Sequence, residues 1–372
     1  MPVTDTEVLP GVEPDVTEGV NTAMKPEDIS CPLPIGEHDT VQLSHGSGGR
    51  MTQDLVSRLF LWAFDNHHLN RRDDAALLDV ARGKLAFSTD TFVVDPIFFP
   101  GGSIGDLAVN GTVNDLCCHG GIPRYLSAGF VLEEGLLLTE LKSVVVAMKR
   151  AAEAARVSIV CGDTKVVNRG KGDKIFVNTS GLATIEHPYR IGADQLRPGD
   201  RILINGTIGD HGVAILSCRQ GLSFQTPIES DTAPLCDLVQ AVLSQVGEGL
   251  HAMRDATRGG VAATLNELAA SSDVGIQLQS DALPVAPAVR GACELLGLDP
   301  LYVANEGKML FVVTPEVAAI ALNALRAHPQ GVNAAIIGEV VAESSGMVSV
   351  RMPLGTSRIV DMPVGEQLPR IC

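Results

Sequence analysis

Residues 139–160 read TELKSVVVAMKRAAEAARVSIV, and this stretch decides the class of fold. Apolar side chains repeat at helical spacing over 139–156, and a short apolar run follows at 157–160. The first pattern predicts an amphipathic helix and the second a buried strand. Because a helix that leads into a buried strand is typical of α/β proteins, we expect a sheet covered by helices.

The chain on both sides of this stretch shows the same mixture of patterns. In the first half we predict a helix over 105–118 and strands over 73–78, 84–90, 127–132 and 175–185. In the second half we predict helices over 232–246, 260–270, 285–296 and 315–327, and strands over 201–205, 274–278, 309–313, 335–340 and 347–351. The expected fold is α/β (α+β), with an N-terminal domain over 37–188 and a C-terminal domain over 189–352. Residues 1–36 are predicted to be a disordered acidic leader and 353–372 a flexible tail.

Composition excludes several classes of function. The 372 residues carry a formal net charge of −16 and only 4% aromatic side chains, so a nucleic-acid partner is not expected. No apolar run has the length of a membrane span, and the first residues do not resemble a signal peptide. The eight cysteines show no C-x-x-C spacing and do not read as a disulfide framework. We therefore expect a cytoplasmic protein.

A glycine-rich turn, SHGSGG at 44–49, precedes the first predicted helix. Gly46, Gly48 and Gly49 would leave backbone N–H groups free to cradle a phosphate at the start of that helix. A glycine turn that serves only chain geometry explains the same residues. Another segment, GDTK at 162–165, follows the predicted strand at 157–160, where ligands of α/β proteins gather. Lys165 there either contacts a phosphate or an oxygen of the substrate, or forms a salt bridge within a turn.

Aspartates at the ends of the predicted elements suggest a metal site. Asp73, Asp74, Asp90 and Asp115 lie beside small residues, and carboxylate oxygens are the ligands that Mg²⁺ prefers. Caps and solvated turns are the plainer interpretation of any single aspartate. Asp90 and Asp115 are the strongest candidates, because their surroundings are otherwise apolar and a buried carboxylate needs a partner.

Two further features are the acidic turn at Glu306 and the last residue, Cys372. Glu306 lies in the segment NEGK at 305–308, which presents a carboxylate on a turn before a predicted strand. Cys372 follows a segment rich in glycine and proline, so its thiol could be carried to a distant site. A surface thiol at a frayed end is the alternative.

Taken together, these motifs resemble the HypE family of nickel–iron hydrogenase maturation proteins, within the aminoimidazole ribonucleotide synthetase (PurM-like) superfamily. The resemblance covers about residues 40–372. It rests on SHGSGG at 44–49, DDAA at 73–76, AVNGTVND at 108–115, GDTK at 162–165, DATRGG at 255–260, NEG at 305–307 and PRIC at 369–372. The terminal PRIC is the most specific of these marks, because relatives in the superfamily lack the final cysteine.

The resemblance implies a homodimer built through the sheets of the N-terminal domains, with ATP and Mg²⁺ bound near that interface. A carbamoyltransferase partner would load Cys372, and ATP would drive dehydration of the carbamoyl group to a thiocyanate. The cyano group would then pass to an iron held by a scaffold of two further proteins. Nucleotide contacts would come from Gly46, Gly48, Gly49, Asp90, Asn110, Asp163 and Thr164, and metal contacts from Asp73, Asp74, Asp90 and Asp115.

Phosphorylating the amide oxygen would turn it into a leaving group, with Lys165 stabilising that oxygen or the γ-phosphate. Glu306 or Asp115 would then take the proton from nitrogen. Two alternatives stay open at this point. One is another PurM-like enzyme, such as an aminoimidazole ribonucleotide or selenophosphate synthetase. The other is a non-catalytic thiol carrier.

Overall fold

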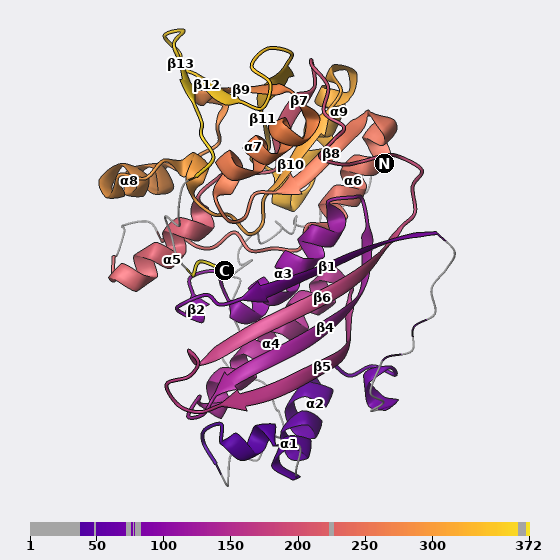
Figure 1. The fold of residues 1–372 in the computed structure, drawn as a ribbon, viewed down its shortest axis with the longest axis vertical. Helices are drawn as coiled ribbons and strands as arrows, with labels where there is room; N and C mark the ends of the chain where they lie inside the picture. Colours follow the sequence, from indigo (N-terminus) through magenta and orange to yellow (C-terminus); the bar gives the residue numbers. More distant parts are fainter. Residues whose placement is uncertain are drawn as a thin grey trace, which may run out of the picture.

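The computed structural model describes residues 38–47, 50–71, 76, 78, 83–222, 227–363 and 370–372. The predicted leader at 1–36 and the candidate residues Gly48, Gly49, Asp73 and Asp74 lie outside this part of the chain. The molecule is elongated, with the two halves of the chain stacked end to end and the C-terminus at their junction (Figure 1).

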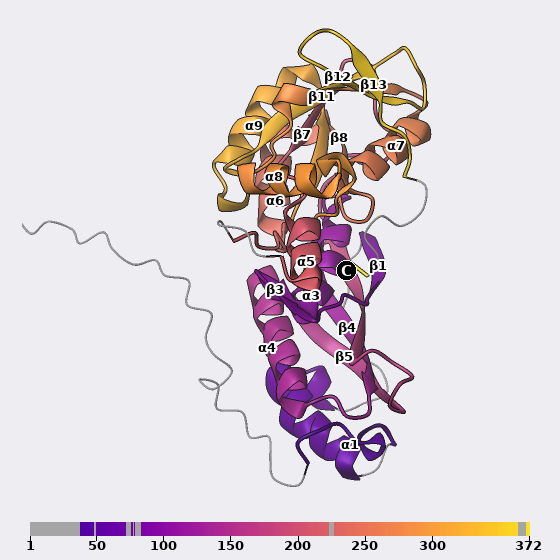
Figure 2. The ribbon, with the colours of Figure 1, turned by 90° about the vertical axis from the view of Figure 1, so that its left-hand side faces the viewer.

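The N-terminal half is built on a four-stranded sheet in the order β1-β6-β4-β5. Strands β1 and β4 pair antiparallel with β6, and β4 and β5 pair in parallel. The bounds are β1 (Lys84–Phe92), β4 (Ile122–Glu133), β5 (Ser158–Val167) and β6 (Ile175–Ile185). Helices α3 (Ile104–Cys117) and α4 (Leu138–Ala155) cover one face of this sheet (Figure 2).

Close contact between the two helices follows from their small residues. A Cβ added to Gly105 of α3 would lie 2.3 Å from the carbonyl oxygen of Val144 in α4, so only glycine allows this approach. Side chains such as Leu107, Leu141 and Met148 fill the space between the helices and the sheet. Smaller elements complete this half: α1 (Arg50–Leu55), α2 (Leu61–Ala63), β2 (Phe98–Phe99) and β3 (Gly102–Ser103).

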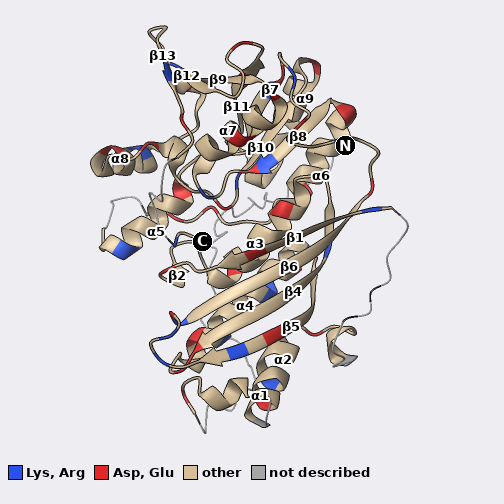
Figure 3. Cartoon of the chain, viewed as in Figure 1, with Lys and Arg blue, Asp and Glu red and all other residues tan. Residues whose placement is uncertain are grey.

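The opposite face of the sheet is open and partly apolar. Phe87 is 69% exposed, and Leu85 and Val131 are exposed as well. Figure 3 shows few charged residues on the strands of this sheet apart from β5. An exposed apolar face of this kind is unusual for a monomer and indicates an interaction surface.

The C-terminal half contains a seven-stranded sheet in the order β13-β12-β9-β11-β7-β10-β8. Its strands are β7 (Arg201–Ile204), β8 (Leu250–Asp255), β9 (Gly275–Gln279), β10 (Met309–Val313), β11 (Ala335–Val341), β12 (Val348–Arg351) and β13 (Ser357–Ile359). The helices are α5 (Asp210–Gln220), α6 (Cys236–Val246), α7 (Gly260–Ser272), α8 (Pro287–Leu296) and α9 (Ala318–Arg326). In the described parts of the chain, no helix is both long and apolar enough to cross a membrane.

Two predictions of local structure are wrong, and two elements were missed. The segment GDTK at 162–165 does not follow a strand but continues it, because β5 pairs with β4 as far as Val167. The expected tail at 353–372 starts too early, since β13 adds to the edge of the second sheet and Val360 is buried. Sequence patterns also missed α5 and β8, and both of these elements contribute to the site described next.

Candidate functional site

The last residues of the chain are seated between the two halves rather than free. The Val93 N–H donates to the main-chain oxygen of Cys372 at 3.0 Å, and the Asp95 N–H donates to the carbonyl of Arg370 at 3.3 Å. The Arg370 side chain donates from Nε to the carbonyl of Val93 at 3.0 Å and pairs with Asp173. Only 9% of Cys372 is exposed. The terminal cysteine is therefore brought to a defined place.

The Cys372 thiol faces acidic groups. Burial raises its pKa well above the ordinary range, and the charge of Glu306 and a hydrogen bond to that side chain add to the shift. Arg258 opposes the shift without cancelling it. The seated cysteine is thus a neutral thiol, and a neutral thiol is a poor nucleophile. This buried position therefore suits a Cys372 whose sulfur already carries a covalently bound group better than a free thiol that has still to attack one.

Four carboxyl groups from separate elements lie close enough to act on one another: Asp90 of β1, Asp115 of α3, Asp255 at the end of β8, and Glu306 in the turn before β10. Of these, Glu306 and Asp90 act on the Cys372 thiol. Burial is the main cause that raises the pKa of each. Their mutual repulsion contributes, since Asp115 raises the pKa of Asp90 and of Asp255. Glu306 also lies in the field of Asp90, Asp115, Asp255 and Asp231.

A cluster of buried acids is costly unless a cation shares it. Among the described residues, the one cation paired with Asp90 is Arg258, whose guanidinium lies 3.8 Å from the Asp90 carboxylate. Asn110 adds a buried side-chain oxygen that lacks a hydrogen-bond partner within the described chain. A cavity of about 490 Å³ opens beside Ser88, Asp115, Cys118 and Asp255. Among the residues that the structure describes, no three His, Cys, Asp or Glu side chains are grouped so that they could hold a metal ion. A Mg²⁺ ion at Asp90 and Asp115 would therefore need further oxygen ligands, such as those of a phosphorylated ligand.

The repulsion between these carboxylates can be tested at Asp255 through the pH dependence of stability. Burial, with the charge of Asp115, raises the pKa of Asp255 from 3.8 to about 7. The folded protein therefore keeps a proton that the unfolded chain gives up, so the contribution of Asp255 to stability is lost as the pH rises from about 4 to about 7. In metal-free buffer, Asp255→Asn is expected to raise the free energy of unfolding by roughly 2–4 kcal/mol near pH 8, and by less near pH 5.

Urea unfolding over this pH series measures the effect, with the exposed Asp281→Asn as the matched control. A variant no more stable than the wild type near pH 8 would contradict the expected repulsion.

A second group of predicted residues lies at the far edge of the first sheet. Asp163, Thr164 and Lys165 are on β5, which forms one edge, whereas Asp90 is on β1 at the other. The Lys165 ammonium lies 2.9 Å from the Asp163 carboxylate, and both side chains are largely exposed. Gly46 packs tightly on this strand, because an added Cβ would lie 2.6 Å from the Val166 nitrogen. Within one chain, the structure does not bring Lys165 to Cys372.

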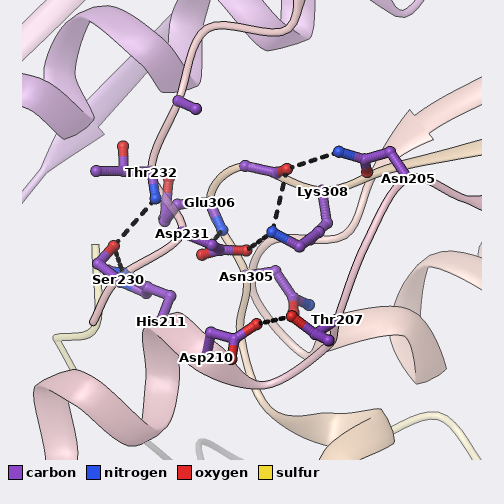
Figure 4. A network of polar contacts seen from close by, with 12 residues as sticks. Asn205, Thr207, Asp210, His211, Ser230, Asp231, Thr232, Asn305, Glu306 and Lys308 are labelled. Carbon is purple, nitrogen blue, oxygen red and sulfur yellow. Dashed lines mark hydrogen bonds and ion pairs between the residues drawn. The ribbon is translucent and has the colours of Figure 1, made fainter. Parts of the chain in front are cut away.

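Sequence reasoning missed several residues of the site. In the sequence, Asp255 and Arg258 stood out only as part of the motif DATRGG at 255–260. Asp231 and Lys308 form a buried ion pair at 2.8 Å, shown in Figure 4 beside Glu306. His211 contacts the seated tail. His211 lies in α5, which the patterns did not predict. Asp231 directly precedes the helix predicted over 232–246, and Lys308 lies two residues after Glu306 in NEGK, but nothing in the sequence linked the two.

Comparisons with known proteins agree with this geometry. Residues 72–185 and 197–351 match the N-terminal and C-terminal domains, respectively, of AIR synthase related proteins. Carbamoyl dehydratase HypE of Bradyrhizobium diazoefficiens is 53% identical over 332 residues, which cover 89% of this chain and 96% of that protein. The chain belongs to the HypE family. HypE of Escherichia coli K12 is 50% identical, with 90% of this chain and all of that protein covered.

Solved structures of HypE show the same fold. A crystal structure of HypE in complex with ATP matches with a TM-score of 0.87 at 50% identity, and covers 90% of this chain and 100% of that one. The predicted family and the two-domain PurM-like fold are thereby confirmed. A different synthetase of the superfamily, which was one alternative, loses its support at this level of identity to HypE.

Proposed function

We propose that this chain uses ATP to dehydrate an S-carbamoyl group on Cys372 to a thiocyanate, the source of cyanide ligands for nickel–iron hydrogenase. The observation that carries the proposal is the seat of Cys372 against Glu306, beside a cluster of buried and half-buried carboxyl groups. A carbamoyl group on this sulfur would lie beside Glu306, a candidate base, and in the field of Asp90.

ATP supplies the phosphoryl group that makes the carbamoyl oxygen a leaving group. The chain's own residues would do the remaining work. Glu306, whose raised pKa makes its carboxylate a stronger base, would take a proton from the carbamoyl nitrogen. Burial of Cys372 would exclude water, which would otherwise hydrolyse the activated group. Asp115 is the second candidate base, because it lines the cavity beside Asp255.

Mg²⁺ would be held by Asp90 and Asp115, and by Asp73 and Asp74, whose positions lie outside the described residues. The nucleotide would be held by Gly46, Gly48, Gly49, Asp90, Asn110, Asp163 and Thr164. The half-buried acids Asp90 and Asp115 and the unpartnered oxygen of Asn110 support these assignments. The assignment of the substrate oxygen or γ-phosphate to Lys165 needs another chain, since Lys165 and Cys372 lie apart in one copy.

A homodimer through the open faces of the N-terminal sheets would provide that second chain. Its support is the exposed apolar face that includes Leu85, Phe87 and Val131. In this arrangement, Lys165 of one copy would face the site of the other. The residues on β5 of one copy would then lie near the residues on β1 of the other copy, although the two strands form opposite edges of the sheet within one chain.

A carbamoyltransferase would load Cys372 away from its seat, because the seated thiol is buried and neutral. A solved HypE–HypF complex, whose HypE chain matches with a TM-score of 0.74 at 47% identity, supports such a partner. A scaffold of two proteins would then accept the cyano group on iron. A cytoplasmic setting fits the cysteines of the described chain, all of which are free thiols.

Mass spectrometry of the C-terminal peptide tests the proposal. The full chain is incubated with a HypF-type carbamoyltransferase, carbamoyl phosphate and ATP, and Glu-C releases residues 367–372. We expect this peptide to gain a carbamoyl group and then, only with ATP, to lose one water. Carbamoylation without later loss of water would indicate a thiol carrier, and an unmodified peptide would refute both functions.

A further inference from the structure

A buried histidine holds the chain directly before the functional cysteine. His211, in the first turn of α5, is fully buried, and its Nε2 lies 2.8 Å from the carbonyl oxygen of Ile371. Its Nδ1 lies 2.8 Å from the hydroxyl of Ser230. Because a carbonyl oxygen can only accept, Nε2 must carry the proton in this contact.

The partners of Ser230 agree with that tautomer. The backbone N–H of Thr232 donates to the Ser230 hydroxyl oxygen at 3.2 Å, which leaves the hydroxyl hydrogen free for Nδ1 of His211. Burial is the main cause that lowers the pKa of His211, so the ring is neutral and Nδ1 can accept. Hydrogen bonds thus run in one direction, from the Thr232 backbone through Ser230 and His211 to Ile371.

The same three residues, 230–232, also contact the acidic turn. The Asp231 carboxylate accepts from the backbone N–H of Glu306 at 3.1 Å and pairs with Lys308 at 2.8 Å (Figure 4). Thr232 accepts from the Asn110 side chain of α3 at 3.1 Å. Segment 230–232 packs tightly against the acidic turn, because a Cβ on Gly307 would lie 1.9 Å from the Asp231 carbonyl oxygen.

Segment 230–232 therefore joins three parts of the site. Through Ser230 it sets the histidine that holds the tail, through Asp231 it fixes the backbone of Glu306, and through Thr232 it meets the N-terminal half. Each contact is buried or half-buried, where hydrogen bonds hold geometry more firmly than at the surface. A shift of this segment would move the seat of Cys372 and Glu306 together.

We propose that His211, oriented by Ser230, is a positioning residue that seats Cys372, and that segment 230–232 couples this seat to Glu306. The role of His211 in seating Cys372 is inferred from the contacts alone, and only the coupling to Glu306 rests on the proposed function. His211 touches the backbone of the tail and not the sulfur, so its role is to place the cysteine.

Alkylation of the full chain without ATP tests the seat. Iodoacetamide reacts with Cys372 when the tail leaves its seat, and the peptide 367–372 released by Glu-C reports the rate. His211→Ala is expected to speed this reaction about five- to tenfold, by loss of one buried hydrogen bond. His211→Gln, whose amide N–H can still donate to Ile371, should restore most of the protection.

Two references separate the seat from general loosening of the fold. The exposed Cys218 reports any global change in thiol reactivity. Ser217→Ala removes a buried hydroxyl that donates to the Val213 carbonyl within α5, and it should leave Cys372 protected. Alkylation of His211→Ala at the wild-type rate, or of His211→Gln as fast as His211→Ala, would overturn the role of His211.

Single-turnover kinetics of pre-carbamoylated protein test the coupling. Ser230→Ala should lower the rate of water loss from the tail at saturating ATP and leave the KM for ATP unchanged. An unchanged rate, or a loss confined to ATP affinity, would overturn the coupling. The alkylation result needs neither ATP nor a carbamoyl group, so it stands even if the chain proves unable to form a thiocyanate.

Discussion

Cys372→Ala is expected to abolish carbamoyl-dependent ATP turnover, with a loss of at least about a thousandfold, because the atom that carries the reacting group is gone. The fold and the binding of ATP should survive. The seat of residues 370–372 is made by backbone hydrogen bonds of Val93 and Asp95 and by the Arg370 side chain, none of which needs the sulfur. The variant thus removes the sulfur that carries the reacting group and leaves the other residues of the site in place.

The matched control is Cys218→Ala, which deletes an exposed free thiol on α5 and should keep full activity. Turnover is followed as phosphate release with the carbamoyltransferase and carbamoyl phosphate present, and ATP binding by calorimetry. A Cys372→Ala chain that still gained a carbamoyl group on another cysteine and turned over ATP would refute the tail as the substrate. Loss of ATP binding in the variant would show instead that the sulfur is part of the nucleotide site.

Several parts of this site could be predicted from the sequence because their chemistry shows in single residues. A carboxylate in small, apolar surroundings needs a partner, and this singled out Asp90 and Asp115, which the structure brings together with Glu306 and Cys372. The main helices and strands of the first half followed from apolar periodicity, as with α4 and β6. These features depend on neighbouring residues in the sequence, so they can be recognised without knowledge of the fold.

What could not be predicted depends on packing between distant segments. Helix α5 lacks an apolar stripe, because its buried residues include His211, Gly212 and Ser217 beside the apolar ones, and so the role of His211 was hidden. Pairing with β4 carries β5 through a glycine and three polar residues that resemble a turn. The placement of Lys165 on the opposite edge from Asp90 is a matter of strand order, which no periodicity reveals.

Glu306 is the residue whose replacement separates loading from dehydration. Glu306→Gln keeps the size of a side chain that is 2% exposed and removes its ability to take a proton. The backbone bond from Glu306 N–H to Asp231 is unaffected by the change. We expect the carbamoylated tail to form normally and then to accumulate, with the rate of water loss down by about 10²–10⁴-fold, the usual contribution of a general base.

Mass spectrometry of peptide 367–372 over time measures both steps in one sample, and Glu316→Gln, at an exposed position of the same domain, is the control. Asp115→Asn decides between the two candidate bases. Its carboxylate accepts from the Ser88 hydroxyl at 2.7 Å and lines the cavity, so its loss should weaken metal and nucleotide binding first. Normal water loss in Glu306→Gln together with accumulation in Asp115→Asn at saturating ATP would transfer the role of base to Asp115. The reverse result assigns it to Glu306, the only one of the two whose charge acts directly on the Cys372 thiol in the seated tail.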